Sequence, residues 1–194
     1  TGACIPGITQ RCCSQDERHG VILSVNQRKR AYSCPMAAAI APILIALASF
    51  VLRLVNLGST KGYIFDEVYY VDGARDLLKY GVEVSGSNPE FIVHPPVGKW
   101  LIGGGIAIFG DNEFGWRFAT ALIGTLLILV FARLVHVLFY SPVLTGLGAA
   151  LMALDGLLLV HSRTALLDLF LTFFILIAIL LWHRGRHWWA GIAF

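Results

Sequence analysis

Four long apolar runs limit what this chain can fold into. They cover residues 36–54, 118–139, 143–160 and 166–182, and each carries very few charged residues. A transmembrane helix needs about 20 apolar residues to cross a hydrocarbon core of about 30 Å, so the runs predict four membrane spans. The composition agrees, because 57% of the residues are hydrophobic and only 14% are charged, whereas soluble domains carry roughly a quarter of charged residues. The predicted fold class is therefore all-α, a polytopic integral membrane protein.

The positions of the basic residues predict how these spans are oriented. Residues 28–30 are all basic and precede the first run, Arg133 closes the second, and Arg184 and Arg186 follow the fourth. Because cytoplasmic flanks are enriched in Lys and Arg, four spans place all three groups on the cytoplasmic side. A further apolar stretch, 97–109, is short for a span and is predicted to be an interfacial or re-entrant helix. Residues 55–116 then form a large external loop.

The first 35 residues are polar and are predicted to form a cytoplasmic tail. They contain all the cysteines of the chain: Cys4, Cys12, Cys13 and Cys34. We expect reduced thiols there, and the spacing does not match a zinc site. A cleavable signal peptide is an alternative, because basic residues precede an apolar stretch that ends in Ala-Leu-Ala. We favour a membrane span because the apolar run continues past that point to Leu57.

The two ends and the net charge add two further expectations. The chain begins with Thr, and residues 188–194 look like the start of a fifth span, so we expect a piece of a longer protein. Residues 36–194 would then be the N-terminal part of a transmembrane domain. The net charge is only +3, and no basic cluster is interleaved with aromatic residues, which argues against nucleic acid as a partner.

Several ionisable residues lie near the predicted external face, where charges are costly and are usually functional or paired. They are Asp66, Glu67, His94, Lys99, Arg117, Arg163 and Asp168.

Structural roles are the alternative for each of these residues. Arg163 can pair with Asp168 or Asp155, Arg75 is within reach of Glu67, Lys99 can extend to the interface, and His94 can cap a turn.

The adjacent carboxylates Asp66 and Glu67 indicate a particular chemistry. Neighbouring residues on a helix point about 100° apart, so the pair cannot face each other across a sugar as in a glycosidase. One carboxylate can instead act as a general base on a hydroxyl while the other supports its segment. Arg117 has the side chain that grips a phosphate with two parallel hydrogen bonds. A base and a phosphate ligand at membrane level suggest group transfer from a lipid phosphate, and no residues have metal-ligand spacing.

Several segments of the chain, in order, resemble the protein O-mannosyltransferase family, especially its actinobacterial type. The segments are FDEVYYVDGARDLL, GVE, EFIVHPPVGKWLI, FGWRFATALIGT, ALDG and SRTALLDLFLTFF, which fall between residues 54 and 182. The resemblance implies a GT-C-type glycosyltransferase fold whose first external loop carries the Asp-Glu motif. It implies a polyprenyl-phosphate-mannose donor and, as acceptor, a Ser or Thr hydroxyl of an exported protein, which it can meet at the secretion translocon.

The resemblance also implies roles for individual residues. Asp66 would be the catalytic base with Glu67 beside it, and Arg117 would bind the donor phosphate. His94, Lys99, Arg163 and Asp168 would occupy other recurrent segments of the site. The implied enzyme inverts the configuration of the sugar, uses no cofactor or metal, and acts on the external face of the cell membrane.

Other functions remain open on the residues alone. The main alternative is a GT-C enzyme that moves another sugar or uses a lipid acceptor, because no residue here identifies the sugar. A transporter would more often place its charges within broken helices and carry internal repeats, and a non-catalytic membrane subunit would need neither Asp66 nor Arg117.

Overall fold

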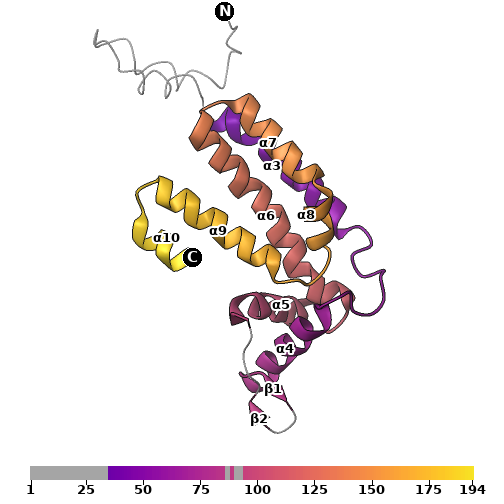
Figure 1. Cartoon of the computed structure of the whole chain (residues 1–194). Coiled ribbons are helices and arrows are strands. Elements are labelled where there is room, and N and C mark those ends of the chain that lie inside the picture. The colour runs from indigo at the N-terminus through magenta and orange to yellow at the C-terminus, as the bar shows by residue number, and fades with distance from the viewer. Residues whose placement is uncertain (1–34, 86–87, 90–93) are drawn as a thin grey trace, which may run out of the picture.

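The computed structural model describes residues 35–85, 88–89 and 94–194, and Figure 1 shows their arrangement. In chain order the helices are α3 (Pro35–Leu54), α4 (Glu67–Tyr80), α5 (Pro96–Phe109), α6 (Glu113–Phe139), α7 (Pro142–Leu154), α8 (Gly156–His161), α9 (Asp168–His183) and α10 (His187–Ala193). The described strands are β1 (Val84–Ser85) and β2 (Asn88–Pro89), an antiparallel pair. The part of the chain that the structure describes is otherwise helical or loop, which confirms the predicted all-α class.

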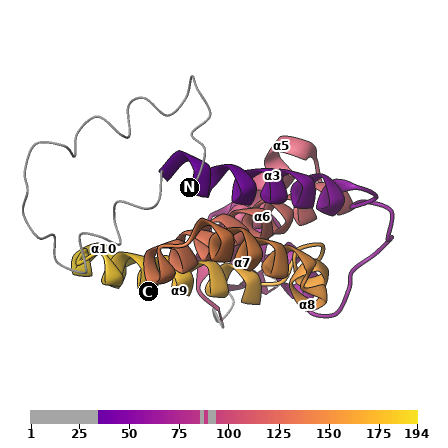
Figure 2. The same ribbon diagram turned by 90° about the horizontal axis from the view of Figure 1, so that it is seen from above.

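Helix α6 is the central element of the bundle. It contacts α3, α5, α7, α8 and α9. Figure 1 shows α4, α5 and the strand pair gathered at its N-terminal end, and α10 folded back beside α9. Turned by 90°, Figure 2 shows α3 and α9 on different sides of α6. We call the end with α4 and α5 the α4 end, and the end where α6 finishes and α7 begins the α7 end.

The boundaries of α6 follow from capping groups at both ends. The side chain of Asn112 accepts hydrogen bonds from the backbone N–H groups of Phe114 (3.1 Å) and Gly115 (3.0 Å), as an N-cap does. This cap starts the helix five residues before the predicted span 118–139. At the other end Tyr140 has a left-handed backbone (φ 51°), and Ser141 caps α7 directly afterwards. The tight turn makes α6 and α7 antiparallel neighbours.

The predicted span 143–160 is broken at Asp155. This residue has an extended backbone, and its carboxylate accepts a hydrogen bond of 2.6 Å from the N–H of Leu158 at the start of α8. Asp155 is therefore an N-cap between two helices, a role in which Asp satisfies otherwise unpaired backbone N–H groups.

Glycines let α5 approach the backbone of α6. A Cβ atom at Gly105 would overlap the carbonyl oxygen of Gly115, and one at Gly115 would overlap that of Gly110. Gly105, within the stretch predicted as interfacial, thus serves helix packing.

The buried side chains form two clusters along α6. One cluster, at the α4 end, includes Val71 of α4, Ile102 of α5 and Leu169 of α9. The other, toward the α7 end, joins Ala46 of α3 to Ala132 of α6 and Ala149 of α7. The α4 end is thus a packed extension of the helical bundle.

Among the described helices, α6 is the one whose length and composition suffice to cross a membrane. Residues Ala39–Leu54 of α3, and α5, α7 and α9, form shorter apolar helices. The predicted runs 36–54 and 166–182 coincide closely with α3 and α9, and the predicted tail up to residue 34 lies outside the described residues.

Candidate active site

A buried ion pair fixes the start of α4 to α6. The guanidinium of Arg117 donates to both oxygens of Glu67, from Nε at 2.8 Å and from Nη2 at 2.7 Å. Both side chains are buried, with at most 1% of either exposed. A buried pair overcomes its desolvation cost only when its remaining donors and acceptors are also satisfied. The other contacts of both groups therefore decide what the pair does.

The carboxylate of Glu67 also binds two backbone N–H groups. Oε2 accepts from Ile64 at 3.0 Å, and Oε1 accepts from Ala165 at 2.8 Å. Ile64 precedes α4, and Ala165 lies in the turn between α8 and α9. One carboxylate thus joins four segments: the loop before α4, α4 itself, α6 and the turn before α9.

The remaining N–H groups of Arg117 bind backbone carbonyls of the loop before α4. The acceptors are Thr60 (2.8 Å), Gly62 (2.8 Å) and Leu57 (3.5 Å). No N–H group of this guanidinium is left for a phosphate. The structure therefore does not support the phosphate-binding role predicted for Arg117, and it favours a role in which Arg117 positions Glu67 and the loop.

Asp66 differs from Glu67 in its exposure and in its hydrogen bonds. It is the N-cap residue of α4, yet its side chain makes no capping hydrogen bond, and it is partly exposed. Among the described residues, no hydrogen bond or ion pair engages its carboxylate. A carboxylate held at a fixed helix start and left without a partner is available to accept a proton.

The residue before Asp66 has a strained backbone. Phe65 has φ 54°, in the left-handed region that a bulky residue rarely adopts, and its side chain is 81% exposed. Such conformations persist where the surroundings hold them, often at functional sites. Here the hydrogen bonds of Glu67 to Ile64 and Arg117 hold both sides of the turn.

Tyr70, one helical turn after Asp66, gathers three of the predicted site residues. Its ring lies 5.4 Å from the ring of His94, edge to face. Burial raises the pKa of the Tyr70 hydroxyl, and the negative charges of Asp66 and Asp168 raise it further. Tyr70 therefore contacts His94 and lies within electrostatic range of both carboxylates.

His94 and Asp168 also line a largely apolar cavity of about 320 Å³. Its apolar walls come from α5, α9 and α10, and include Val97, Phe170, Phe174 and Ile192. Gly98 brings α5 close to α9, because a Cβ there would lie 2.5 Å from the Leu167 side chain. The cavity has polar groups at one side and hydrocarbon walls, which suits an amphiphilic ligand.

Lys99 lies apart from this group. Its Nζ forms a buried ion pair of 2.5 Å with Glu83, between α4 and α5. Gly73 makes room for the pair, since a Cβ there would lie 3.0 Å from Glu83 Oε2. The contact supports a structural role for Lys99 within the α4 end.

Arg163 also has structural partners, which are not the carboxylates expected for it. Its guanidinium donates to the carbonyl oxygens of Leu52 (3.0 Å) and Val55 (2.8 Å) at the end of α3. Basic side chains commonly bind these unpaired carbonyls at helix C-termini. The pairing with Asp155 or Asp168 considered for it from the sequence does not occur.

Sequence reasoning missed Arg53, which is fully buried in the bundle. Its Nε donates to Ser162 Oγ at 2.8 Å, and Nη1 binds Ser49. The residue ended an apolar run and looked like an ordinary flanking charge. Glu83 was missed because its partner is far along the chain. Tyr70 could have been found, since it lies four residues after Asp66 and so on the same helix face.

Comparison with known proteins identifies the relatives of this chain. Residues 93–192 match the family described as dolichyl-phosphate-mannose-protein mannosyltransferase. A polyprenol-phosphate-mannose–protein mannosyltransferase of Mycobacterium tuberculosis is 45% identical over 141 residues, which are 70% of this chain and 26% of the relative. The enzyme of that name from Mycolicibacterium smegmatis is 40% identical over 142 residues, 70% of this chain and 27% of the relative.

A relative with a different named sugar also matches. An undecaprenyl phosphate-alpha-4-amino-4-deoxy-L-arabinose arabinosyl transferase of Pseudomonas aeruginosa is 32% identical over 146 residues, 72% of this chain and 26% of the relative. The chain spans about a quarter of the length of these relatives. No solved structure matches the chain significantly. By the family match over half of its length, the chain belongs to the dolichyl-phosphate-mannose-protein mannosyltransferase family.

Proposed function

We propose that the whole protein transfers mannose from a polyprenyl-phosphate-mannose lipid to Ser or Thr hydroxyls of exported proteins. The observation that carries the proposal is the carboxylate of Asp66, which has no partner among the described residues. It lies in a group with Tyr70, His94 and Asp168 beside an apolar cavity. The names of the mycobacterial relatives give the donor and the type of acceptor.

The reaction is a one-step displacement with inversion at the anomeric carbon. Asp66 accepts the proton of the acceptor hydroxyl as its oxygen forms a bond to that carbon. The bond between the anomeric carbon and the phosphate oxygen breaks, and polyprenyl phosphate leaves. Glu67 and Arg117 hold Asp66 in place through the buried contacts described above, so we assign them positioning roles.

The cavity between α5, α9 and α10 accepts the first part of the lipid chain. Its hydrocarbon walls suit isoprenoid units, and His94 at its edge can donate a hydrogen bond to the phosphate. Asp168, on the same edge, can accept hydrogen bonds from sugar hydroxyls. We propose that the step uses no metal ion, with the hydrogen bond from His94 stabilising the charge that develops on the leaving phosphate.

The protein is proposed to be a multi-pass protein of the cell membrane with a cytoplasmic N-terminus. The α4 end and Asp66 then face outward, where an exported acceptor emerges from the secretion translocon. Support comes from the basic residues 133, 184 and 186, which belong to the segments that end away from Asp66.

Transfer of another sugar is the second candidate function, and the arabinosyl transferase relative favours it. One experiment distinguishes the two candidate functions. Membranes that contain the whole protein receive one of two radiolabelled donors, either polyprenyl-phosphate-mannose or an undecaprenyl-phosphate aminoarabinose. A Ser/Thr-rich exported peptide and the lipids of the same membranes are each available as acceptors. Label from mannose on the peptide supports the proposal, and label only from the aminosugar, or only on the lipid, contradicts it.

A further inference from the structure

The α7 end of the bundle carries positive charge that no described carboxylate balances. Arg133 lies near the end of α6, and Arg184 and Arg186 follow α9. The segments around these arginines, residues 35–46, 129–149 and 178–188, contain no Asp or Glu. Arg133 and Arg184 lie close enough to repel each other, and no hydrogen bond or ion pair engages the Arg133 guanidinium within the described part of the chain.

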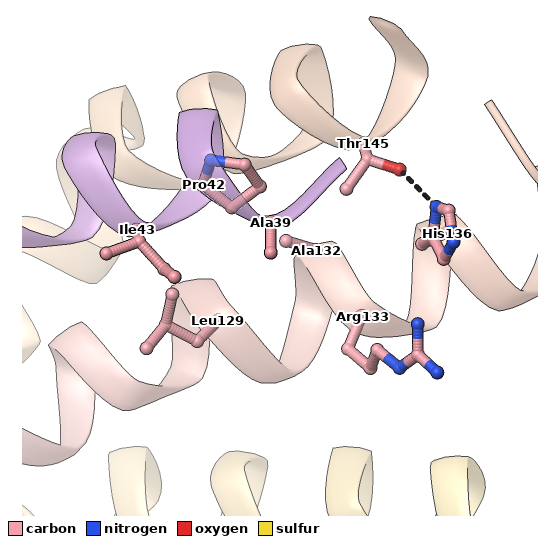
Figure 3. Close-up of a pocket in the computed structure, with 8 residues that line it drawn as sticks. All are labelled: Ala39, Pro42, Ile43, Leu129, Ala132, Arg133, His136 and Thr145. Atoms are coloured by element: carbon pink, nitrogen blue, oxygen red, sulfur yellow. Dashed lines mark hydrogen bonds between the residues drawn. The ribbon is translucent and has the colours of Figure 1, made fainter. Parts of the chain in front are cut away.

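A second cavity lies next to these charges, between α3, α6 and α7. It has a volume of about 110 Å³, and its apolar wall includes Ala39, Pro42, Ile43 and Leu129. The space is open because small side chains, Ala39 and Ala132, lie between α3 and α6, as Figure 3 shows. The cavity therefore offers a largely apolar slot between these helices.

Polar groups border the slot on one side. Figure 3 shows Arg133 and His136 on the last turns of α6, and the imidazole of His136 reaches Thr145 of α7. The Nδ1–Oγ1 distance is 3.3 Å, while the hydroxyl of Thr145 donates to the carbonyl of Ser141 at 2.7 Å. Because that hydroxyl donates to Ser141, its oxygen can accept a hydrogen bond from Nδ1 of His136, and no described residue binds Nε2.

This site is separate from the candidate active site. Arg133 follows Arg117 by 16 residues on α6, which corresponds to about 24 Å along a helix. We propose that the slot and Arg133 form a binding site for an anionic phospholipid of the bilayer, with an acyl chain between α3 and α6 and the phosphate at Arg133. The proposal does not rest on the mannosyltransferase activity.

Charge decides between this ligand and other occupants. The chain segment that precedes α3 carries three consecutive basic residues at positions 28–30, so it would add repulsion. A second copy would bring the same arginines to the same place. An anionic headgroup neutralises them, and basic pockets at the cytoplasmic end of transmembrane helices bind such headgroups.

The test compares lipids on the whole protein in a neutral detergent. Phosphatidylglycerol or phosphatidylcholine with identical acyl chains is titrated while the thermal midpoint is followed, and native mass spectrometry counts the bound lipids. Phosphatidylglycerol should raise the midpoint with saturation at one or a few lipids, and phosphatidylcholine should not. Equal effects of the two lipids would overturn the proposal.

Variants then locate the site. Arg133→Gln should weaken the phosphatidylglycerol effect about fivefold, the factor expected for one basic residue. Lys79→Gln removes the same charge from exposed α4 at the other end and should change nothing. Ala39→Phe, at an exposed lining position, should fill the slot and abolish the effect with all charges kept. If Arg133→Gln fails to fold, Ala39→Phe decides alone, and undiminished binding in that variant contradicts the site.

Discussion

At the scale of single residues, the adjacent carboxylates differ in their surroundings: Asp66 has no side-chain partner among the described residues, and Glu67 is buried and paired. The sequence predicted this difference, because neighbouring positions on a helix face different directions. It did not predict the partner of Glu67, for which Arg75 was a candidate. Arg75 instead binds Asp111 with three hydrogen bonds and also Asp72. Arg117 is the partner of Glu67 because the fold places the start of α6 next to the start of α4. The spacing of the two residues in the sequence does not predict this contact.

The coupling between Glu67 and Arg117 is a residue-scale prediction. Glu67→Gln and Arg117→Lys should each lower stability in detergent by about 3–5 kcal/mol, because each leaves a buried charge without its full set of partners. The double variant should lose less than the sum, with a coupling of about 0.5–3 kcal/mol. Thermal or denaturant unfolding of the wild type, the two single variants and the double variant measures this coupling.

The same four proteins distinguish positioning from phosphate binding. If Arg117 only positions Glu67, donor binding measured with radiolabelled lipid should fall in proportion to the folded fraction. If a well-folded Arg117→Lys protein binds the donor tenfold or more weakly, Arg117 binds the donor phosphate after all.

At the scale of elements, helix limits were predictable where capping residues are strong and unpredictable where tertiary packing decides. The run 166–182 corresponds to α9 almost residue for residue. The sequence of residues 143–160 did not predict the helix break at Asp155. A single carboxylate within an apolar run looks like a buried charge, and only the structure shows that it accepts a capping hydrogen bond from the N–H of Leu158. The stretch 97–109 was predicted as interfacial, and within it Gly105 packs directly against the backbone of α6.

The close approach of α5 and α6 gives a prediction with a matched control. Gly105→Ala places a methyl group against the carbonyl of Gly115, so it should destabilise the protein by about 1–3 kcal/mol. Gly104→Ala adds the same methyl group where no atom lies within 4 Å, and should stabilise α5 by up to about 1 kcal/mol. Unfolding midpoints of the two variants are compared, and equal midpoints would contradict the described helix contact.

At the scale of the whole molecule, the topology is a prediction that the helices make testable. In a cysteine-free background, single cysteines at Asn88, exposed at the α4 end, and at Ser141, between α6 and α7, are treated with a membrane-impermeant thiol reagent. Intact cells should label position 88, and position 141 should label only after lysis. The reverse pattern would move Asp66 to the cytoplasm and remove access to exported acceptors.

The sequence revealed more of the molecule's identity than of its internal contacts. Ordered motifs between residues 54 and 182 were sufficient for the family, and a family match over residues 93–192 confirms it. The group formed by Asp66, His94 and Asp168 could be named but not assembled, since these residues belong to three segments that only the fold brings around Tyr70. Lys99 and Arg163 looked equally functional from the sequence, because a charge paired with Glu83 or with helix carbonyls looks the same there as a catalytic one.

The central claim is that Asp66 is the general base of mannosyl transfer, and one comparison tests it most directly. Asp66→Asn keeps the size of the side chain but cannot accept a proton, whereas Asp72→Asn changes an exposed carboxylate on the same helix. Membranes with equal amounts of each whole protein receive radiolabelled polyprenyl-phosphate-mannose and a Ser/Thr-rich peptide. Asp66→Asn should bind the donor normally and transfer about 10²–10⁴ times more slowly, and Asp72→Asn should match the wild type. Transfer by Asp66→Asn at a tenth or more of the wild-type rate would contradict the account.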